Sequence, residues 1–296
     1  MRPRSRFTAK IARVVVLADG AKPEVRPRLA EVEAFLLERG LEVHLEADVR
    51  QFCTASENGG PQLAFGRPDL VVVLGGDGSV LTAVRSFGDD PVPVLGINYG
   101  RVGFLAPVEA SAWRQGLLDA LEGHATQELR MRLDVRTPDG RSFLALNDVV
   151  LARSPSTNMI SLSLRADGDR VGDYRADGLI LATPSGSTAY NLAAGGPILA
   201  PTMDGIVATP ISAHTLSHRP LVLAPGADLR VEVLAGPAQV VVDGQPAGTL
   251  QVGESVHVRR AAYPYPLLLP DGMDPWKRLR DRLGWRGSLL SPGSDE

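Results

Sequence analysis

The sequence is poor in several residue types, and each scarcity excludes something. Cys53 is its one cysteine, so no disulfide can form within the chain, and a reducing cytoplasmic location is expected. The longest apolar runs fall far short of the roughly 20 residues that a membrane-spanning helix needs, so no membrane partner is expected. The formal net charge is −3, which argues against nucleic acid as a partner because such binding needs a basic face.

Two common nucleotide-binding motifs are also missing. A P-loop requires Gly-Lys followed by Ser or Thr, but Lys10, Lys22 and Lys277 follow Ala, Ala and Trp. The Rossmann fingerprint also fails, since its third glycine position is occupied by Leu81. Any phosphate site must therefore use another loop.

What the sequence does contain is one dense glycine turn. Residues 70–74 are Leu-Val-Val-Val-Leu, which predicts a strand buried on both faces. The turn Gly75-Gly76-Asp77-Gly78-Ser79 follows, and residues 79–84 resume with helical spacing. Such a turn presents backbone N–H groups to a phosphate at a helix N-terminus, although a plain turn capped by Asp77 is an equal alternative.

The order of the predicted elements indicates two domains. Strands at 12–18, 41–45, 70–74 and 92–97 alternate with helices at 23–39 and 110–121, which predicts a Rossmann-like α/β domain with a parallel sheet. Residues 47–67 lack periodicity and are expected to form a surface loop. Beyond residue 125, short strands between turn residues predict an antiparallel, sandwich-like β domain.

The C-terminal part is expected to return to the first domain. Residues 263–266, Tyr-Pro-Tyr-Pro, are interpreted as an exit linker, and residues 276–283 as a short helix that docks on the α/β domain. The predicted limits are therefore 1–122 for the α/β domain, 123–265 for the β-rich domain and 266–296 for the returning segment.

Two further polar clusters stand out in the β-rich part. Residues 177–190 run from Asp177 through a strand into Thr-Pro-Ser-Gly-Ser-Thr-Ala-Tyr, whose hydroxyls and free N–H groups suit phosphate or ribose oxygens. Asn147 and Asp148 interrupt an apolar strand and could bind a nucleoside. Each cluster alone has a structural alternative, a capped turn for the first and a simple turn for the second.

Together, the three clusters resemble the NAD kinases, the ATP- or polyphosphate-dependent enzymes that make NADP from NAD. Residues 75–79 are similar to the family's Gly-Gly-Asp-Gly-Thr element, with Ser79 in place of Thr, and residues 96–105 are similar to its following loop. Asn147-Asp148 stands where the family usually has Asn-Glu, and residues 183–190 match its most diagnostic motif. Residues 210–222 and Asp243-Gly244-Gln245 complete the series.

The resemblance implies that NAD lies between the two domains and that the 2′-hydroxyl of its adenosine ribose accepts the phosphoryl group. Asp77, the one carboxylate of the glycine turn, is assigned to general-base or hydroxyl-orienting duty, with a metal-holding role as an open alternative. Mg²⁺ or another divalent cation is the expected cofactor. Apart from the open alternative for Asp77, no residue is predicted to bind this cation. The remaining expected binding residues are Gly76, Gly78, Ser79, Asn147, Asp148, Asp177, Ser185, Thr188, Ala189 and Tyr190.

Other functions are compatible with parts of this pattern. The glycine turn is shared with lipid kinases and sugar kinases, and a non-catalytic NAD(P)-binding sensor could use the same loops. A sensor would gain by losing the negative charge of Asp77 near phosphates, which favours an enzyme. The resemblance further implies a homodimer or homotetramer built through edge strands of the β domain.

Overall fold

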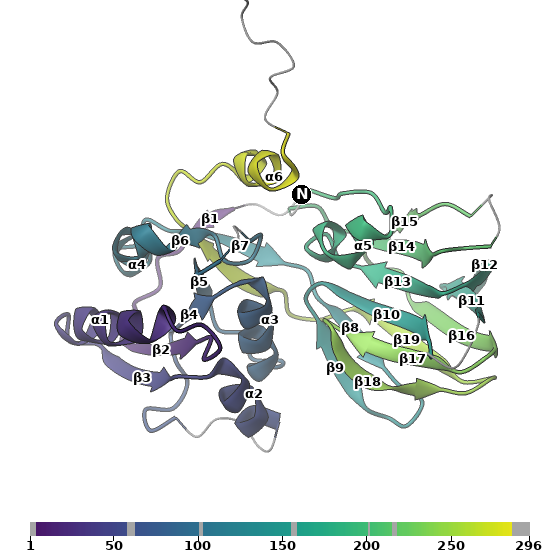
Figure 1. Ribbon diagram of the computed structural model, residues 1–296, viewed down its shortest axis with the longest axis horizontal. Helices are drawn as coiled ribbons and strands as arrows, with labels where there is room; N and C mark the ends of the chain where they lie inside the picture. Colours follow the sequence, from purple (N-terminus) through teal and green to yellow (C-terminus); the bar gives the residue numbers. More distant parts are fainter. Residues whose placement is uncertain are drawn as a thin grey trace, which may run out of the picture.

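The computed structural model describes residues 4–57, 63–100, 103–154, 159–200, 202–214 and 218–285. Two lobes lie side by side, and helix α3 occupies the side of the first lobe that faces the second (Figure 1). Within the described residues, no helix is long and apolar enough to span a membrane.

The first lobe is built on one mixed sheet. Its strand order is β1-β7-β20-β5-β4-β2-β3, with β6 paired to β5, and β3, β2, β4, β5 and β20 run parallel to one another. The predicted Rossmann-like arrangement is therefore confirmed. The strand bounds are β1 Ser5–Arg6, β2 Arg13–Ala18, β3 Glu42–Glu46, β4 Leu70–Gly75, β5 Val94–Asn98, β6 Val108–Glu109, β7 Thr126–Arg130 and β20 Tyr265–Leu269.

Helices cover both faces of this sheet, because the central strands are apolar on both sides. Val14 and Val72 belong to the buried cluster that includes α1 (Val25–Leu37) and α4 (Trp113–Leu121), the latter preceded by the 3-10 turn η1 (Ala110–Ala112). Val15 and Val73 belong to the opposite cluster, with α2 (Val49–Glu57) and α3 (Asp77–Ser86). Gly40 follows α1 with φ +74°, the left-handed conformation that favours glycine after a helix.

Helix α2 corrects one prediction, since residues 47–67 were expected to be a loop. Val49, Phe52 and Cys53, at i, i+3 and i+4, are 2–3% exposed, and Val49 and Phe52 belong to the buried cluster that covers this face of the sheet. The polar residues between them hide this short periodicity in the sequence. Residues 58–62 of the predicted loop lie outside the described part of the chain.

Two strands reach the first sheet from later in the chain. β7 pairs antiparallel with β20, and β20 pairs parallel with β5 at Leu267 and Val94. Residues 265 and 266, which were interpreted as the end of a linker, instead begin β20. The domain limits at 122/123 and 265/266 stay predictions.

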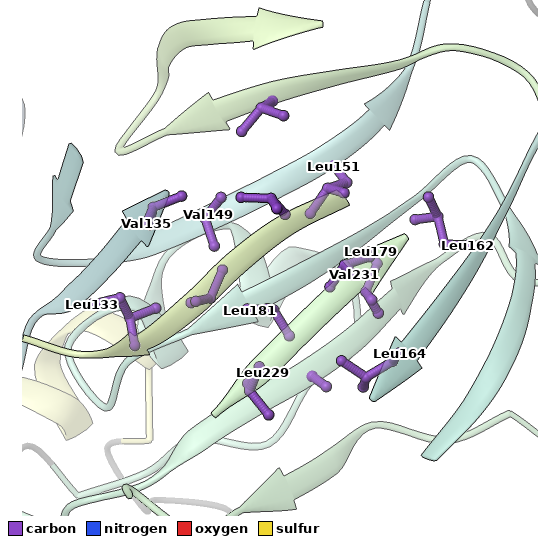
Figure 2. Close-up of a cluster of buried hydrophobic side chains, with 14 of the residues drawn as sticks. Leu133, Val135, Val149, Leu151, Leu162, Leu164, Leu179, Leu181, Leu229 and Val231 are labelled. Atoms are coloured by element: carbon purple, nitrogen blue, oxygen red, sulfur yellow. The ribbon is translucent and has the colours of Figure 1, made fainter. Parts of the chain in front are cut away.

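The second lobe is an antiparallel sandwich, as predicted. One sheet has the order β15-β14-β13-β10-β17-β18 and the other β12-β11-β16-β19-β8-β9. Figure 2 shows the core between them, where leucines and valines from both sheets interdigitate. The bounds are β8 Leu133–Arg136, β9 Ser142–Ala145, β10 Asp148–Arg153, β11 Ile160–Ala166, β12 Asp169–Ala176, β13 Gly178–Ala182, β14 Ile206–Ile211, β15 Leu221–Leu223, β16 Leu229–Ala235, β17 Ala238–Val242, β18 Gln245–Leu250 and β19 Ser255–Arg260.

Short helices lie at the edges of this arrangement. The 3-10 turn η2 (Gly186–Thr188) and α5 (Tyr190–Ala193) follow β13. Helix α6 (Pro275–Leu283) lies above the junction of the two lobes (Figure 1). It begins at Asp274, whose side chain accepts from the N–H of Trp276, and ends at Gly284 with φ +68°.

Candidate active site between the two domains

The glycine turn lies at the carboxyl end of the parallel strands. β4 ends at Gly75, which is paired with Asn98 at the end of β5, and α3 starts at Asp77. The hydroxyl of Ser79 donates to Asp19 (3.1 Å) at the end of β2 and accepts weakly from the N–H of Gly76 (3.4 Å). Because open α/β sheets bind ligands at this edge, the turn stands where a ligand is expected.

Asp77 anchors the loop that follows β5. Its Oδ2 accepts from the N–H of Phe104 (2.8 Å), and its Oδ1 accepts from the N–H groups of Leu105 (2.9 Å) and Ala106 (3.1 Å). A Cβ on Gly103 would lie 1.8 Å from Oδ1, so the close approach requires glycine there. Asp77 is half-buried. Its Oδ1 accepts two of these three hydrogen bonds and its Oδ2 accepts one.

A pocket of about 300 Å³ opens beside the same turn. Gly76, Gly78 and Ser79 line it together with Asp19, Lys22, Val49, Arg50 and Thr82. The Lys22 ammonium donates to the carbonyl of Tyr99 (2.5 Å) and lies 3.9 Å from Asp19 Oδ2. The first-turn N–H groups of a helix lack intrahelical partners, so α3 offers donors here alongside two basic side chains.

The second half of the site is a turn held by another carboxylate. Asp243 lies in the turn between β17 and β18 with φ +46°. Its oxygens accept from three consecutive N–H groups, those of Leu146 (2.7 Å), Asn147 (2.7 Å) and Asp148 (3.0 Å). This contact fixes the backbone of the Asn147-Asp148 turn before β10.

The hydroxyl-rich loop after β13 packs on that turn. Thr183 donates through its N–H to the carbonyl of Asn147 (2.8 Å) and through its hydroxyl to that of Leu146 (2.6 Å). A Cβ on Gly186 would lie 2.0 Å from the Asn147 carbonyl oxygen, so glycine is required at this contact. The structure therefore brings the second and third sequence clusters together.

The polar side chains of this loop differ in exposure. Ser185 is buried, and the hydroxyl of Thr188 donates to its carbonyl (3.1 Å). Ala189 is half-buried and Tyr190 is 48% exposed, so the tyrosine ring is accessible. Asp148 is buried, and burial followed by repulsion from Asp243 raises its pKa to about 7.

Several contacts join the two halves. Arg130, on β7 of the first sheet, donates to the hydroxyl of Ser185 (3.3 Å). Leu146 belongs to the same buried cluster as Val80 of α3 and Leu105. A second pocket of about 560 Å³ lies in the seam, lined by Arg85, Gly88 and Asp89 on one side and by residues 142–144, 242, 243, 245 and 246 on the other.

Asp177 does not join the other predicted residues. It precedes β13, whose far end leads to Thr183, a span of roughly 20 Å at about 3.4 Å per residue. Its carboxylate instead receives a hydrogen bond from Arg153 (2.9 Å), and both side chains are 39% exposed.

Some residues of the site were not predicted. The sequence places Asp243 only in a motif of the resembled family and does not indicate its role as a turn anchor. Asp19 and Lys22 follow the first predicted strand. Their position at the carboxyl edge of the sheet could therefore have indicated that they belong to the site. Arg130 lies among ordinary strand residues and could be found only from the structure.

The arrangement defines a class of protein. In the α/β domain, a helix N-terminus lies beside a pocket lined by two basic side chains, and on the other side of the domain seam two loops of the β sandwich pack on each other. This is the organisation of a two-domain phosphotransferase that acts on a nucleotide.

Comparison with known proteins gives the family. The ATP-NAD kinase N-terminal domain matches residues 14–125, and the ATP-NAD kinase C-terminal domain matches residues 146–269. The chain therefore belongs to the NAD kinase family. It is 42% identical to an NAD kinase of Gemmatimonas aurantiaca over 74% of this chain and 78% of that protein, and 37% identical to one of Burkholderia pseudomallei over 96% and 97%.

Solved structures agree with this assignment. Yeast NADH kinase complexed with NADH superposes with a TM-score of 0.83 at 26% identity, covering 96% of this chain and 90% of that one. An NAD kinase from Archaeoglobus fulgidus in complex with ATP superposes with a TM-score of 0.73 at 27% identity, covering 92% and 97%.

Proposed function

We propose that this protein transfers a phosphoryl group from ATP or polyphosphate to the 2′-hydroxyl of the adenosine ribose of NAD, giving NADP. The observation that carries this proposal is the packing of Leu146, next to Asn147, in one buried cluster with Val80 of α3 and with Leu105 of the loop that Asp77 anchors. Relatives that share most of this chain's length are NAD kinases, and structural neighbours bind NADH and ATP. A cytoplasmic location stays a prediction.

Asp77 serves, in this proposal, as the group that orients the ribose hydroxyl and takes its proton. Three N–H donors already hold the carboxylate, which fixes its position. Oδ2 has one acceptor position beyond its bond to Phe104, and this position is the one we assign to the hydroxyl.

We place the phosphates of the donor in the pocket beside the turn. Gly76, Gly78 and Ser79 would contribute backbone N–H groups, and Lys22 and Arg50 would contribute positive charge. Phosphoryl transfer depends mostly on such positioning and charge stabilisation.

A divalent cation such as Mg²⁺ fits this pocket only when it is bound together with the phosphates of the phosphoryl donor. In the described parts of the chain, no group of three or more His, Cys, Asp and Glu side chains could hold an ion alone. Mg²⁺ is commonly bound by one or two carboxylates together with substrate phosphates, and Asp19 is the carboxylate that lines the pocket. When bound there, the cation would neutralise charge on the phosphates.

NAD would lie against the second half of the site. Asn147 and Asp148 would contact the nucleoside, Thr188 and Ala189 would supply polar backbone and hydroxyl groups, and Tyr190 would offer an accessible ring for stacking. Ser185, whose hydroxyl accepts a hydrogen bond from Arg130 (3.3 Å), would hold this loop in place.

Asp177 can reach such an NAD only from a second copy of the chain. It lies roughly 20 Å along β13 from Thr183, yet it is partly exposed and carries a negative charge suited to an amino group. We therefore infer a homodimer or homotetramer in which Asp177 of one copy contacts the NAD of another. The edge strand β15, with Leu221 39% and Val222 47% exposed, is a candidate contact.

One assay tests the proposed reaction. Purified protein is incubated with NAD, ATP or polyphosphate, and Mg²⁺, and NADP is measured. NADP formation supports the proposal, whereas phosphorylation of a lipid or sugar without NADP would favour a kinase that shares only the glycine turn. Tight NAD binding without ATP consumption would favour a sensor.

A further inference from the structure

A buried cluster of charges lies behind the glycine turn, where β7 meets α6. Glu128 and Arg130 come from β7 and Arg278 from α6, and their side chains are 2%, 3% and 7% exposed. Arg130 donates to Glu128 Oε2 (2.5 Å), Arg278 lies 3.9 Å from the same oxygen, and Arg4 pairs with Oε1. Three guanidinium groups therefore surround one carboxylate.

The excess positive charge of this cluster acts on Asp77. Both Arg130 and Arg278 interact electrostatically with the Asp77 carboxylate. Burial lowers the pKa of Arg130, and burial together with repulsion from Arg130 lowers the pKa of Arg278 to about 10. Burial alone would raise the pKa of Glu128, but the arginines around it hold this pKa below its ordinary value. The Asp77 carboxylate therefore lies within electrostatic reach of both arginines, as a weaker partner than Glu128.

Each arginine also holds one of the two loops of the site. Arg278 donates to the carbonyl of Phe104 (3.0 Å), and the N–H of Phe104 donates to Asp77. Arg130 donates to the hydroxyl of Ser185 (3.3 Å), next to the loop that we assign to NAD. Since both arginines converge on Glu128, the cluster connects the loop anchored by Asp77 to the loop after β13.

We propose that Arg130 and Arg278 are positioning residues that set the distance between the donor half and the NAD half of the site. Stability alone does not explain this cluster, because well-packed apolar residues often replace buried ion pairs without loss of stability. Misplacing reacting groups by about 1 Å can lower a rate about a hundredfold. Since each half would hold its own substrate, the cluster should govern turnover and leave substrate binding unchanged. This inference rests on the division of the site proposed above.

Steady-state kinetics of Arg130→Met and Arg278→Met test the proposal. We expect kcat to fall at least about tenfold in both variants, while KM for NAD and for ATP stays within about twofold. Arg278→Lys should recover part of the lost kcat, because it keeps a charged donor near Phe104 and Asp77. The control is Arg280→Met, which removes an exposed arginine of the same helix that pairs with Asp274 (2.9 Å) and should behave like the wild type.

Two results would overturn the inference. One is a kcat within about twofold of wild type in folded Arg278→Met, and the other is a raised KM for NAD with unchanged kcat, which would make these arginines binding residues. If Arg130→Met does not fold by circular dichroism, Arg278→Met and Arg278→Lys decide the question. A wild-type protein that forms no NADP would instead contradict the proposed function.

Discussion

Two carboxylates do the same structural work on opposite sides of the seam. Asp77 binds the N–H groups of residues 104–106, and Asp243 binds those of residues 146–148. Each side chain replaces the hydrogen bonds that a tight loop cannot make with itself. The loops of the site are therefore held rigidly before any ligand arrives.

Replacing Asp77 by Asn should reduce NADP formation at least about a hundredfold. The amide cannot accept the proton of the hydroxyl. In place of one carboxylate oxygen it also has an NH₂ group, which would face a backbone N–H that donates to Asp77 in the wild type. The rate of NADP formation measures the effect, and the melting temperature separates a chemical loss from a disturbed loop. Near-normal turnover would contradict the role assigned to Asp77.

Asp148 should make stability depend on pH. Burial, and then repulsion from Asp243, raises its pKa to about 7, so the folded protein keeps a proton that the unfolded chain has lost. The free energy of unfolding of the wild type should therefore fall, relative to Asp148→Asn, as pH rises from about 4 to about 7. Urea unfolding of both proteins at pH 5 and pH 8 measures this difference, and an equal difference at both values would contradict it.

Replacing Asp243 by Asn should weaken both folding and NAD binding. Asn keeps one acceptor oxygen, so at least one of three buried N–H groups loses its partner, at a cost of about 1–3 kcal/mol. Urea unfolding and KM for NAD measure the two effects. Asp139→Asn is a matched control in the exposed turn between β8 and β9, and an equal change there would show that the position of Asp243 is not special.

At the scale of elements, strands and loops with strong local signals were predictable. The apolar run of residues 70–74 predicted β4, and the glycines after it predicted where α3 begins. Helix α2 was missed because its buried face is short. β12 and β18 have weak local signals, because they are polar or contain Gly and Pro. These elements form because neighbours cover them, which a local pattern does not reveal.

The loop after β5 gives a prediction at this scale. A methyl group at residue 103 would overlap the Asp77 carboxylate, so Gly103→Ala should displace the loop and lower both melting temperature and kcat. Gly172→Ala, in β12, is the control because a Cβ there meets nothing within 4 Å. If both variants match the wild type, the contact between residue 103 and Asp77 does not matter for the site.

At the scale of the whole molecule, the sequence did not show which strands complete the first sheet. β7 and β20 join the first sheet from distant positions, and the Arg130 contact with Ser185 depends on that pairing. Asp177 is the opposite case, because it is close to the Thr183 motif in sequence but distant from it in space, at the other end of the same strand. Residues that share a motif need not share a site.

The distance of Asp177 predicts complementation between inactive copies. If Asp177 acts on the NAD of another copy, co-expressed Asp77→Asn and Asp177→Ala chains should recover up to about a quarter of wild-type activity, because mixed dimers regain one intact site. NADP formation by the mixture, compared with each variant alone, measures the recovery. A mixture no more active than its parts would contradict the shared site.

The central claim is that NAD lies in the seam with its adenosine ribose facing Asp77. A crystal structure of the protein with NAD tests this most directly. We predict the ribose 2′-hydroxyl within hydrogen-bond reach of Asp77 Oδ2, about 3 Å, with the nucleoside against Asn147 and Asp148. An NAD bound with its ribose away from Asp77 and outside the seam would contradict the account.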